Sequence, residues 1–453
     1  MAVSVAISPG DRGVAPGAVV LAAAIPILFL HVQYQPGVAV GIGSTTVNAY
    51  LSDFAVLALV LTALGEGLRR GFAPLATGRW LWLALGVFVV WVFAEVVLGH
   101  MHAATYASRT HGVTATKFAE YALLAPALPL LVRRMRDLLL PLWSLAIWSG
   151  AATIVGIAQF FGADILFAGP VGRRQASFLG DSDFAALSSA AILVGVVALT
   201  LPRVRDTRLP AAVATVAGAL GMILAGAVAS LLGLVTALAA LAVVVVARHQ
   251  IVPRRLAAVA AIAGVVAGGV VAIRGSDLGA FARFLNATPK SGSTEPARIQ
   301  TYAHRTLLAW IGWQIWKDHP LVGVGWEGSA EPANFAPYLP AAHRRFHEAA
   351  RAFPSAAPNR RYGVQNAWIQ ALADLGVVGL ALWTAVFASS AWLAGRAAIL
   401  LGSAPSLYAL LAVAALAWLW AGQGFVAGIP LDAFTWLAVG LTATRLDVES
   451  AVT

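Results

Sequence analysis

The feature that most constrains this chain is the repetition of long apolar runs. Segments of about 20 residues with few charges recur along most of the 453 residues, and a helix of about 20 apolar residues is long enough to cross a bilayer. Only 11% of the residues are charged and 60% are hydrophobic, whereas about 25% of a soluble domain is charged. The sequence therefore excludes a disordered chain and predicts an all-α, polytopic membrane protein.

The apolar runs predict about twelve transmembrane helices in one transmembrane domain over residues 1–453. The expected spans are residues 17–34, 49–68, 78–98, 116–133, 138–161, 183–202, 209–225, 228–247, 256–273, 374–395, 405–422 and 426–444. The segment 274–373 separates the ninth span from the tenth and is the one long loop of the predicted topology.

The basic residues are distributed unevenly between the short loops. If the N-terminus is cytoplasmic, the cytoplasmic side holds 15 of the 30 Lys and Arg residues, and the opposite short loops hold only Arg109, Lys117, Arg173 and Arg174. A surplus of Lys and Arg in short loops marks the cytoplasmic side, and long loops are exempt from this rule. We therefore expect both termini in the cytoplasm and the loop 274–373 on the outer face.

The long loop contains a segment with helical periodicity. Residues 298–317 place Leu307, Trp310 and Trp313 at helical spacing, which predicts an amphipathic helix lying in the membrane interface. His319 and Pro320 follow, and a residue before proline disfavours the helical conformation. We therefore expect interfacial helices within this loop.

Arginines gather on the predicted outer face. Arg173 and Arg174 share one loop, and Arg298 and Arg305 belong to the predicted interfacial helix. The guanidinium group keeps its charge and binds phosphate oxygens with two parallel hydrogen bonds. Any one of these arginines is better explained as a solvated charge or a headgroup contact, but the set together predicts an anion-binding site, because outer short loops otherwise avoid positive charge.

Four short motifs follow one another in a recognisable order. Gln365-Asn366 is followed by nine residues and then by Gly376-Val-Val-Gly379. The other three are Arg174-Gln-Ala-Ser-Phe-Leu-Gly180 with Asp183-Phe-Ala185, Arg305…Trp310…Asp318-His-Pro-Leu-Val-Gly-Val-Gly325, and Ser52-Asp-Phe54. Together with the twelve spans, these motifs resemble the O-antigen ligase and O-antigen polymerase superfamily of integral membrane glycosyltransferases over most of residues 49–445.

The resemblance implies a reaction and its partners. It implies transfer of a glycan from undecaprenyl diphosphate to a saccharide or glycolipid acceptor, on the outer face of the bacterial cytoplasmic membrane. It also implies that the reaction uses no metal, no other cofactor and no nucleic acid. The catalytic residues expected by position are Gln365, Arg174 and Arg305. The expected substrate-binding residues are Arg173, Arg298, Lys117, Asn366, His304, Glu327, His343 and His347.

One departure from the family pattern concerns the proton acceptor. The family has a histidine where this chain has Gln365, and a glutamine side chain can orient a hydroxyl but cannot take its proton. The possible substitutes nearby in the sequence are His304, Glu327, His343, His347 and Glu348. His343 and His347 have helical spacing, but a metal site is disfavoured because the chain has no cysteine and no well-spaced carboxylate beside them.

Several functions remain open from the sequence. The motif layout favours a ligase, and a polymerase of the same superfamily is the first alternative. A transporter or flippase for lipid-linked or anionic solutes is an alternative of another class, although transporters usually show internal repeats and broken helices. The missing histidine also leaves open a glycan-binding relative without catalytic activity.

Overall fold

The structure is a computed structural model that describes residues 14–42, 45–102, 105–200, 207–250, 252–285, 299–346, 363–425 and 428–446. Within these ranges, nine helices are long and apolar enough to cross a membrane. They are α2 (Leu51–Arg70), α3 (Arg79–His102), α6 (Leu139–Phe160), α7 (Asp181–Thr200), α8 (Arg208–Ala225), α9 (Val228–Ala247), α10 (Pro253–Leu285), α15 (Ala367–Leu400) and α16 (Ala404–Leu419). The prediction of an all-α, polytopic membrane protein is confirmed.

Two further apolar helices are shorter, and the fourth expected span is divided. The short helices are α1 (Pro16–Leu28) and α17 (Ile429–Ala443). In place of the span 116–133 the chain forms α4 (Ser108–Ala122) and α5 (Leu124–Leu131). Proline has no backbone N–H, so Pro126 cannot bond to the carbonyl of Ala122, and the helix is interrupted at this point. Leu123 between them keeps helical angles (φ −64°, ψ −20°).

The remaining elements connect these helices. A β-hairpin of β1 (Gly37–Ile42) and β2 (Thr45–Tyr50) precedes α2, with Gly37 paired to Tyr50. The loop between α10 and α15 contains α11 (Ile299–Asp318), α12 (Pro332–Phe335) and α13 (Leu339–Arg345). Short 3-10 turns cover Val32–Tyr34, Ala73–Gly78, Met135–Leu138, Gly328–Ala330, Ala336–Tyr338 and Trp420–Gly422.

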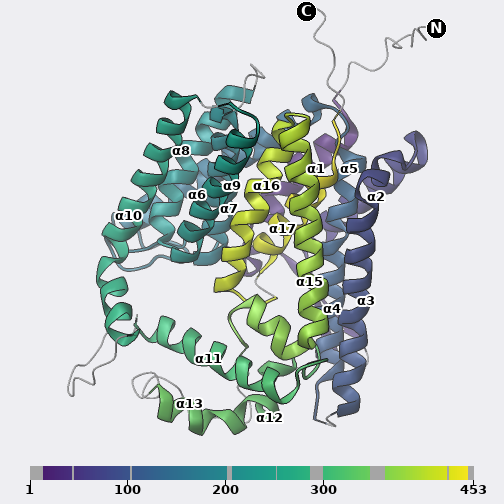
Figure 1. Cartoon of the computed structure of the whole chain (residues 1–453), viewed down its shortest axis with the longest axis vertical. Coiled ribbons are helices and arrows are strands. Elements are labelled where there is room, and N and C mark those ends of the chain that lie inside the picture. The colour runs from purple at the N-terminus through teal and green to yellow at the C-terminus, as the bar shows by residue number, and fades with distance from the viewer. Residues whose placement is uncertain are drawn as a thin grey trace, which may run out of the picture.

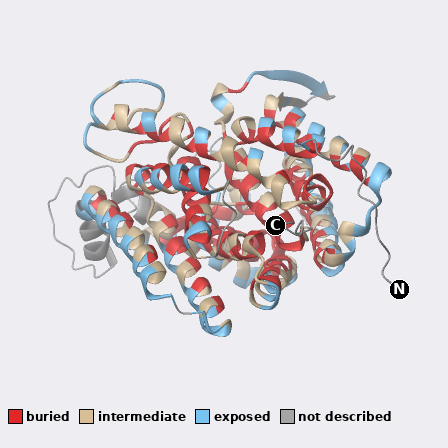
Figure 2. Ribbon diagram, turned by 90° about the horizontal axis from the view of Figure 1, so that it is seen from above, coloured by how far each residue is buried: buried red, intermediate tan, exposed pale blue. Residues whose placement is uncertain are grey.

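The helices form one bundle with α11–α13 gathered at one end (Figure 1). Buried residues occupy its interior and exposed ones its periphery (Figure 2). Of the nine long helices, α7 is the most buried and is therefore the central one. On the periphery large apolar side chains are exposed, such as Leu61 (56%) and Val90 (69%). Such apolar surfaces are unusual on soluble proteins and suit contact with lipid.

The helix predicted from the periodicity of residues 298–317 is confirmed as α11. It has a hydrophobic core of its own. Leu307, Leu308, Ile311 and Ile315 are buried on α11 and pack with residues of α12 and α13. The flanking helices extend into the segment 274–373, since α10 runs to Leu285 and α15 begins at Ala367. This extension places residue 274 inside a helix rather than in a loop.

The helix α15 is kinked at Gly376, and the turns of residues 320–325 pack into the kink. Gly376 has φ 64° and ψ −168°, which is not helical. The N–H of Val377 donates to the carbonyl of Pro320 (2.9 Å), and the N–H of Val324 donates to the carbonyl of Ala373 (3.0 Å). Backbone groups that the kink removes from the helix thus find partners in residues 320–325. This pairing holds the loop after α11 against the first turns of α15.

Candidate functional site

Four of the residues predicted from the sequence line one cavity at the α11 end of the bundle. The cavity has a volume of about 390 Å³. The four residues are Arg174, Arg305, Gln365 and Asn366, and they come from the α6–α7 loop, from α11 and from the start of α15. Segments that are up to about 190 residues apart therefore meet at one place.

Buried amide side chains shape the loop that carries Arg174. The side chain of Gln175, which is fully buried, accepts from the N–H of Gly169 (2.7 Å) and donates to the carbonyl of Pro170 (3.0 Å). The N–H of Gln175 donates to the carbonyl of Leu224 at the end of α8 (2.8 Å). The loop is thus folded on itself and attached to α8, and Arg174 forms an ion pair with Asp181 at the start of α7.

The motif Gln365-Asn366 divides into a cavity-facing residue and a helix cap. The Nε of Arg305 donates to Oε1 of Gln365 (2.9 Å). The side-chain oxygen of Asn366 accepts from the N–H groups of Trp368 and Ile369 (3.1 Å each), which caps α15. Asparagine is among the preferred residues at this position because it satisfies otherwise unpaired N–H groups. Gln365 therefore orients Arg305, and Asn366 fixes the start of the helix that carries Gln365.

A third arginine, which the sequence reasoning missed, lines the same cavity. Arg274 lies on α10 and is only 5% exposed. A Cβ placed on Gly226 would lie 3.3 Å from side-chain atoms of both Arg174 and Arg274, so the two arginines approach the same point of the backbone. The expected span ended at residue 273, which put Arg274 in the loop. An arginine that directly follows an apolar helix was the available signal.

The cavity is strongly positive. Among its lining residues the charged ones are Arg174, Arg274, Arg305 and Asp181, which leaves an excess of two positive charges. In a partly buried site charges interact more strongly than in water. The arrangement therefore suits a ligand group with two negative charges.

Lys117 lies in a different cavity, of about 280 Å³. It forms an ion pair with Asp53, which also accepts from the N–H of Tyr50 (2.7 Å). Asp183 and Asp432 line the same cavity as Lys117, from the first turns of α7 and α17. The structure thus separates Lys117 from the arginine cavity.

The other predicted residues lie outside the described lining of the arginine cavity. Arg173 is half-buried in the same loop as Arg174, and Glu327 contacts His111 and Thr114. His343 lies on α13. His304 is half-buried beside Arg305 on α11, where burial and the charge of Arg305 lower its pKa. Arg298 and His347 lie outside the described residues.

The described residues contain no group of three or more His, Asp or Glu side chains placed to hold a metal ion. The arginine cavity offers charged and amide side chains to a ligand. Its guanidinium groups donate hydrogen bonds and neutralise negative charge.

A comparison with known families gives a match for the region from α8 to the middle of α15. Residues 211–384 match the sequence model of a family described as O-antigen ligase. This region of the chain is similar to an O-antigen ligase domain. The matched region contains Arg274, Arg305 and Gln365, whereas Arg174 precedes it. No curated protein matches the chain.

The O-antigen ligase domain confirms the resemblance that the motifs indicated. The nine long apolar helices are those of a multi-pass membrane protein, and residues 211–384 are similar to the O-antigen ligase family. The matched region supplies Arg274, Arg305 and Gln365 to the arginine cavity, and the preceding part of the chain supplies Arg174 and Asp181.

Proposed function

We propose that this O-antigen ligase domain transfers a glycan from undecaprenyl diphosphate to an acceptor sugar on the outer face of the bacterial cytoplasmic membrane. The observation that carries the proposal is the meeting of Arg174, Arg274 and Arg305 in one cavity whose described wall has a single carboxylate, Asp181. The excess of two positive charges matches a diphosphate.

The reaction breaks the bond between the anomeric carbon and the diphosphate oxygen, and forms a bond from that carbon to the acceptor hydroxyl oxygen. Negative charge develops on the departing diphosphate, so fixed positive charges stabilise the transition state more than the bound substrate. Gln365, held by Arg305, orients the acceptor hydroxyl. The amide of Gln365 cannot take the proton of the acceptor hydroxyl. That proton goes to the carboxylate of Asp181, which lies in the cavity wall.

The test compares arginine variants in a reconstituted assay with a lipid-diphosphate-linked glycan and an acceptor. We expect Arg174→Ala, Arg274→Ala and Arg305→Ala each to lower kcat by about 10²–10³, the effect of removing one transition-state donor, with the melting temperature kept. Arg254→Ala is the matched control, because Arg254 is an exposed residue in the first turn of the same helix α10 as Arg274. Wild-type turnover in Arg174→Ala or Arg305→Ala would contradict the diphosphate role.

The same assay tests the role of Gln365. We expect Gln365→Ala to lower the rate much less than Arg305→Ala does, because Gln365 positions groups and does not carry a proton. Complete loss of transfer in Gln365→Ala, at an unchanged melting temperature, would contradict this assignment.

A deletion strain separates the ligase from its alternatives. For a ligase we expect complete lipid-linked polymer to accumulate, and accumulation of single lipid-linked repeats would instead indicate the polymerase. The cavity lies near α11 at one end of the bundle rather than at mid-height, which favours transfer over transport, since transport sites lie near the bilayer midplane. Lipid-linked units retained on the cytoplasmic face would indicate a flippase.

A further inference from the structure

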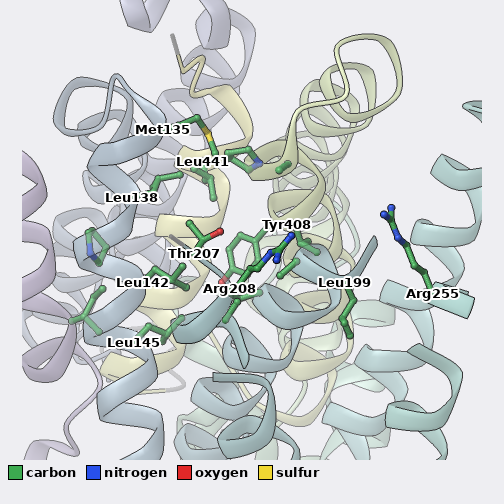
Figure 3. Close-up of a pocket in the computed structure, with 18 residues that line it drawn as sticks. Met135, Leu138, Leu142, Leu145, Leu199, Thr207, Arg208, Arg255, Tyr408 and Leu441 are labelled. Atoms are coloured by element: carbon green, nitrogen blue, oxygen red, sulfur yellow. The ribbon is translucent and has the colours of Figure 1, made fainter. Parts of the chain in front are cut away.

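A second large cavity, of about 400 Å³, is formed by helix ends far from the arginine cavity. It lies between α6, α7, α8, α16 and α17, and most of its lining is apolar. Its apolar side chains include Leu142, Leu145 and Val194. Figure 3 shows the leucines of α6 on one side of the cavity and Tyr408 and Arg208 near its centre.

The two cavities lie at opposite ends of the same helices. The arginine cavity contains residues from the start of α7 and the end of α16, Asp181 and Leu419. The second cavity contains Leu199 from the end of α7 and Ala404 from the start of α16. Since each of these helices is long enough to cross a membrane, the second cavity belongs to the opposite membrane boundary, where α1 begins and α17 ends.

One side of the second cavity is cationic. Arg208 is the first residue of α8, and Arg255 lies in the first turn of α10, while Ala404 is the first residue of α16. The residues that the structure describes in this lining include no acidic side chain. Helix N-termini carry partial positive charge and present N–H groups to anions. Two guanidinium groups and three helix N-termini therefore border the same space.

The apolar side extends into the bundle. Leu145 lies six residues beyond the first residue of α6, and Val194 lies six residues before the last residue of α7. At 1.5 Å per residue each is about 9 Å from its helix end. Figure 3 places Arg255 at the far side of the cavity from these leucines, and its Nη1 donates to the carbonyl of Thr200 (2.9 Å). The space thus has a charged mouth and an apolar interior.

We propose that this cavity binds one anionic glycerophospholipid of the surrounding bilayer. The lipid phosphate would lie beside Arg208 and Arg255 at the helix N-termini, and the first part of an acyl chain would lie against Leu142, Leu145 and Val194. Charge complementarity selects this occupant, because basic pockets between transmembrane helices suit anionic headgroups, and the apolar depth excludes a soluble phosphate as the preferred ligand. The proposal does not depend on the glycan-transfer reaction, which concerns the other end of the bundle.

Native mass spectrometry of the full-length protein in detergent tests the proposal. With dioleoylphosphatidylglycerol as the probe we expect one tightly bound lipid per chain, and with dioleoylphosphatidylcholine much weaker binding. Each Arg near an anionic headgroup contributes about fivefold in affinity, so the double variant Arg208→Ala/Arg255→Ala should weaken phosphatidylglycerol binding about 30-fold. Arg254→Ala is the matched control: Arg254 is exposed, adjacent to Arg255 and absent from the lining, and its loss should leave the affinity unchanged.

A cavity-filling variant keeps the proposal open to refutation. Leu142→Trp retains both arginines and fills the apolar interior, so it should also remove the tightly bound lipid. The affinity for inorganic phosphate should be the same in this variant as in the unaltered protein. Equal binding of the two lipids, an unaltered affinity in the double variant, or an equal loss in Arg254→Ala would overturn the proposal. Full lipid binding in a folded Leu142→Trp variant would show that surface charge alone attracts the lipid. That result would also overturn the proposal.

Discussion

Among single residues, His111 shows how a titrating side chain joins two parts of this molecule. It is 1% exposed on α4, and its Nε2 lies 2.7 Å from Oε1 of Glu331, in the segment after α11. Burial lowers the pKa of His111, but the hydrogen bonds and charges of Glu327 and Glu331 outweigh burial, so the pKa is raised above 6.5. The protonated form is therefore the one that the fold stabilises.

We expect the stabilisation from His111 to depend on pH. A histidine with a raised pKa contributes fully below its unfolded value of 6.5, and the contribution is lost as pH rises through the folded pKa. The melting temperature of the unaltered protein should therefore exceed that of His111→Gln most at pH 6 and least at pH 9. Thr114→Val is the control, because the Thr114 hydroxyl contacts the same Glu327 (2.9 Å) without titrating. A difference that stays constant with pH would contradict the charged pair.

At the scale of elements, the kink of α15 explains the glycines of two motifs. A Cβ on Gly376 would lie 2.1 Å from the carbonyl oxygen of Leu321, and one on Gly323 would lie 2.4 Å from the carbonyl carbon of Asp374. Both residues also have positive φ, 64° and 71°, which side chains disfavour. The two motifs are thus the two sides of one backbone contact.

We expect Gly376→Ala to destabilise the protein by roughly 3 kcal/mol or more, since it combines backbone strain with overpacking against a main chain. Gly395→Ala in the same helix is the matched control, because a Cβ there has no neighbour within 4 Å. That change should be neutral or stabilise by up to about 1 kcal/mol, as alanine favours the helix. Melting curves in detergent compare the two, and equal curves would show that the kink tolerates a side chain.

The same elements show what the sequence could and could not predict. The long helices could be predicted from the length and hydropathy of the apolar runs, which are local properties of the sequence. Arg174 and Arg305 could be predicted as site residues because each belongs to a motif. The pairing of residues 320–325 with the kink depends on contacts between distant segments, as does the approach of Arg274 to Arg174. Pro126 was a local signal for the division between α4 and α5. A hydropathy profile misses this signal, because it does not take into account that proline lacks a backbone N–H.

At the scale of the whole molecule, the arginine cavity and the second cavity, of about 400 Å³, occupy opposite ends of the bundle, so the orientation in the membrane decides which compartment each one serves. If the surplus of basic residues in the short loops marks the cytoplasmic side, as the sequence predicts, the second cavity lies at that side. The arginine cavity then faces outward, where a polar acceptor sugar is accessible. This orientation is a property of the full set of helices and cannot be read from either cavity alone.

The absence of cysteine from the sequence permits a direct test of this orientation. Val171 is 68% exposed in the α6–α7 loop beside the arginine cavity, and Gln250 is exposed between α9 and α10 at the other end. In intact cells we expect a membrane-impermeant maleimide to label Val171→Cys, and to label Gln250→Cys only after the membrane is permeabilised. The cysteine-free protein should remain unlabelled in both conditions. The reverse pattern would place the arginine cavity in the cytoplasm and would contradict transfer on the outer face, while leaving the helix bundle itself unchanged.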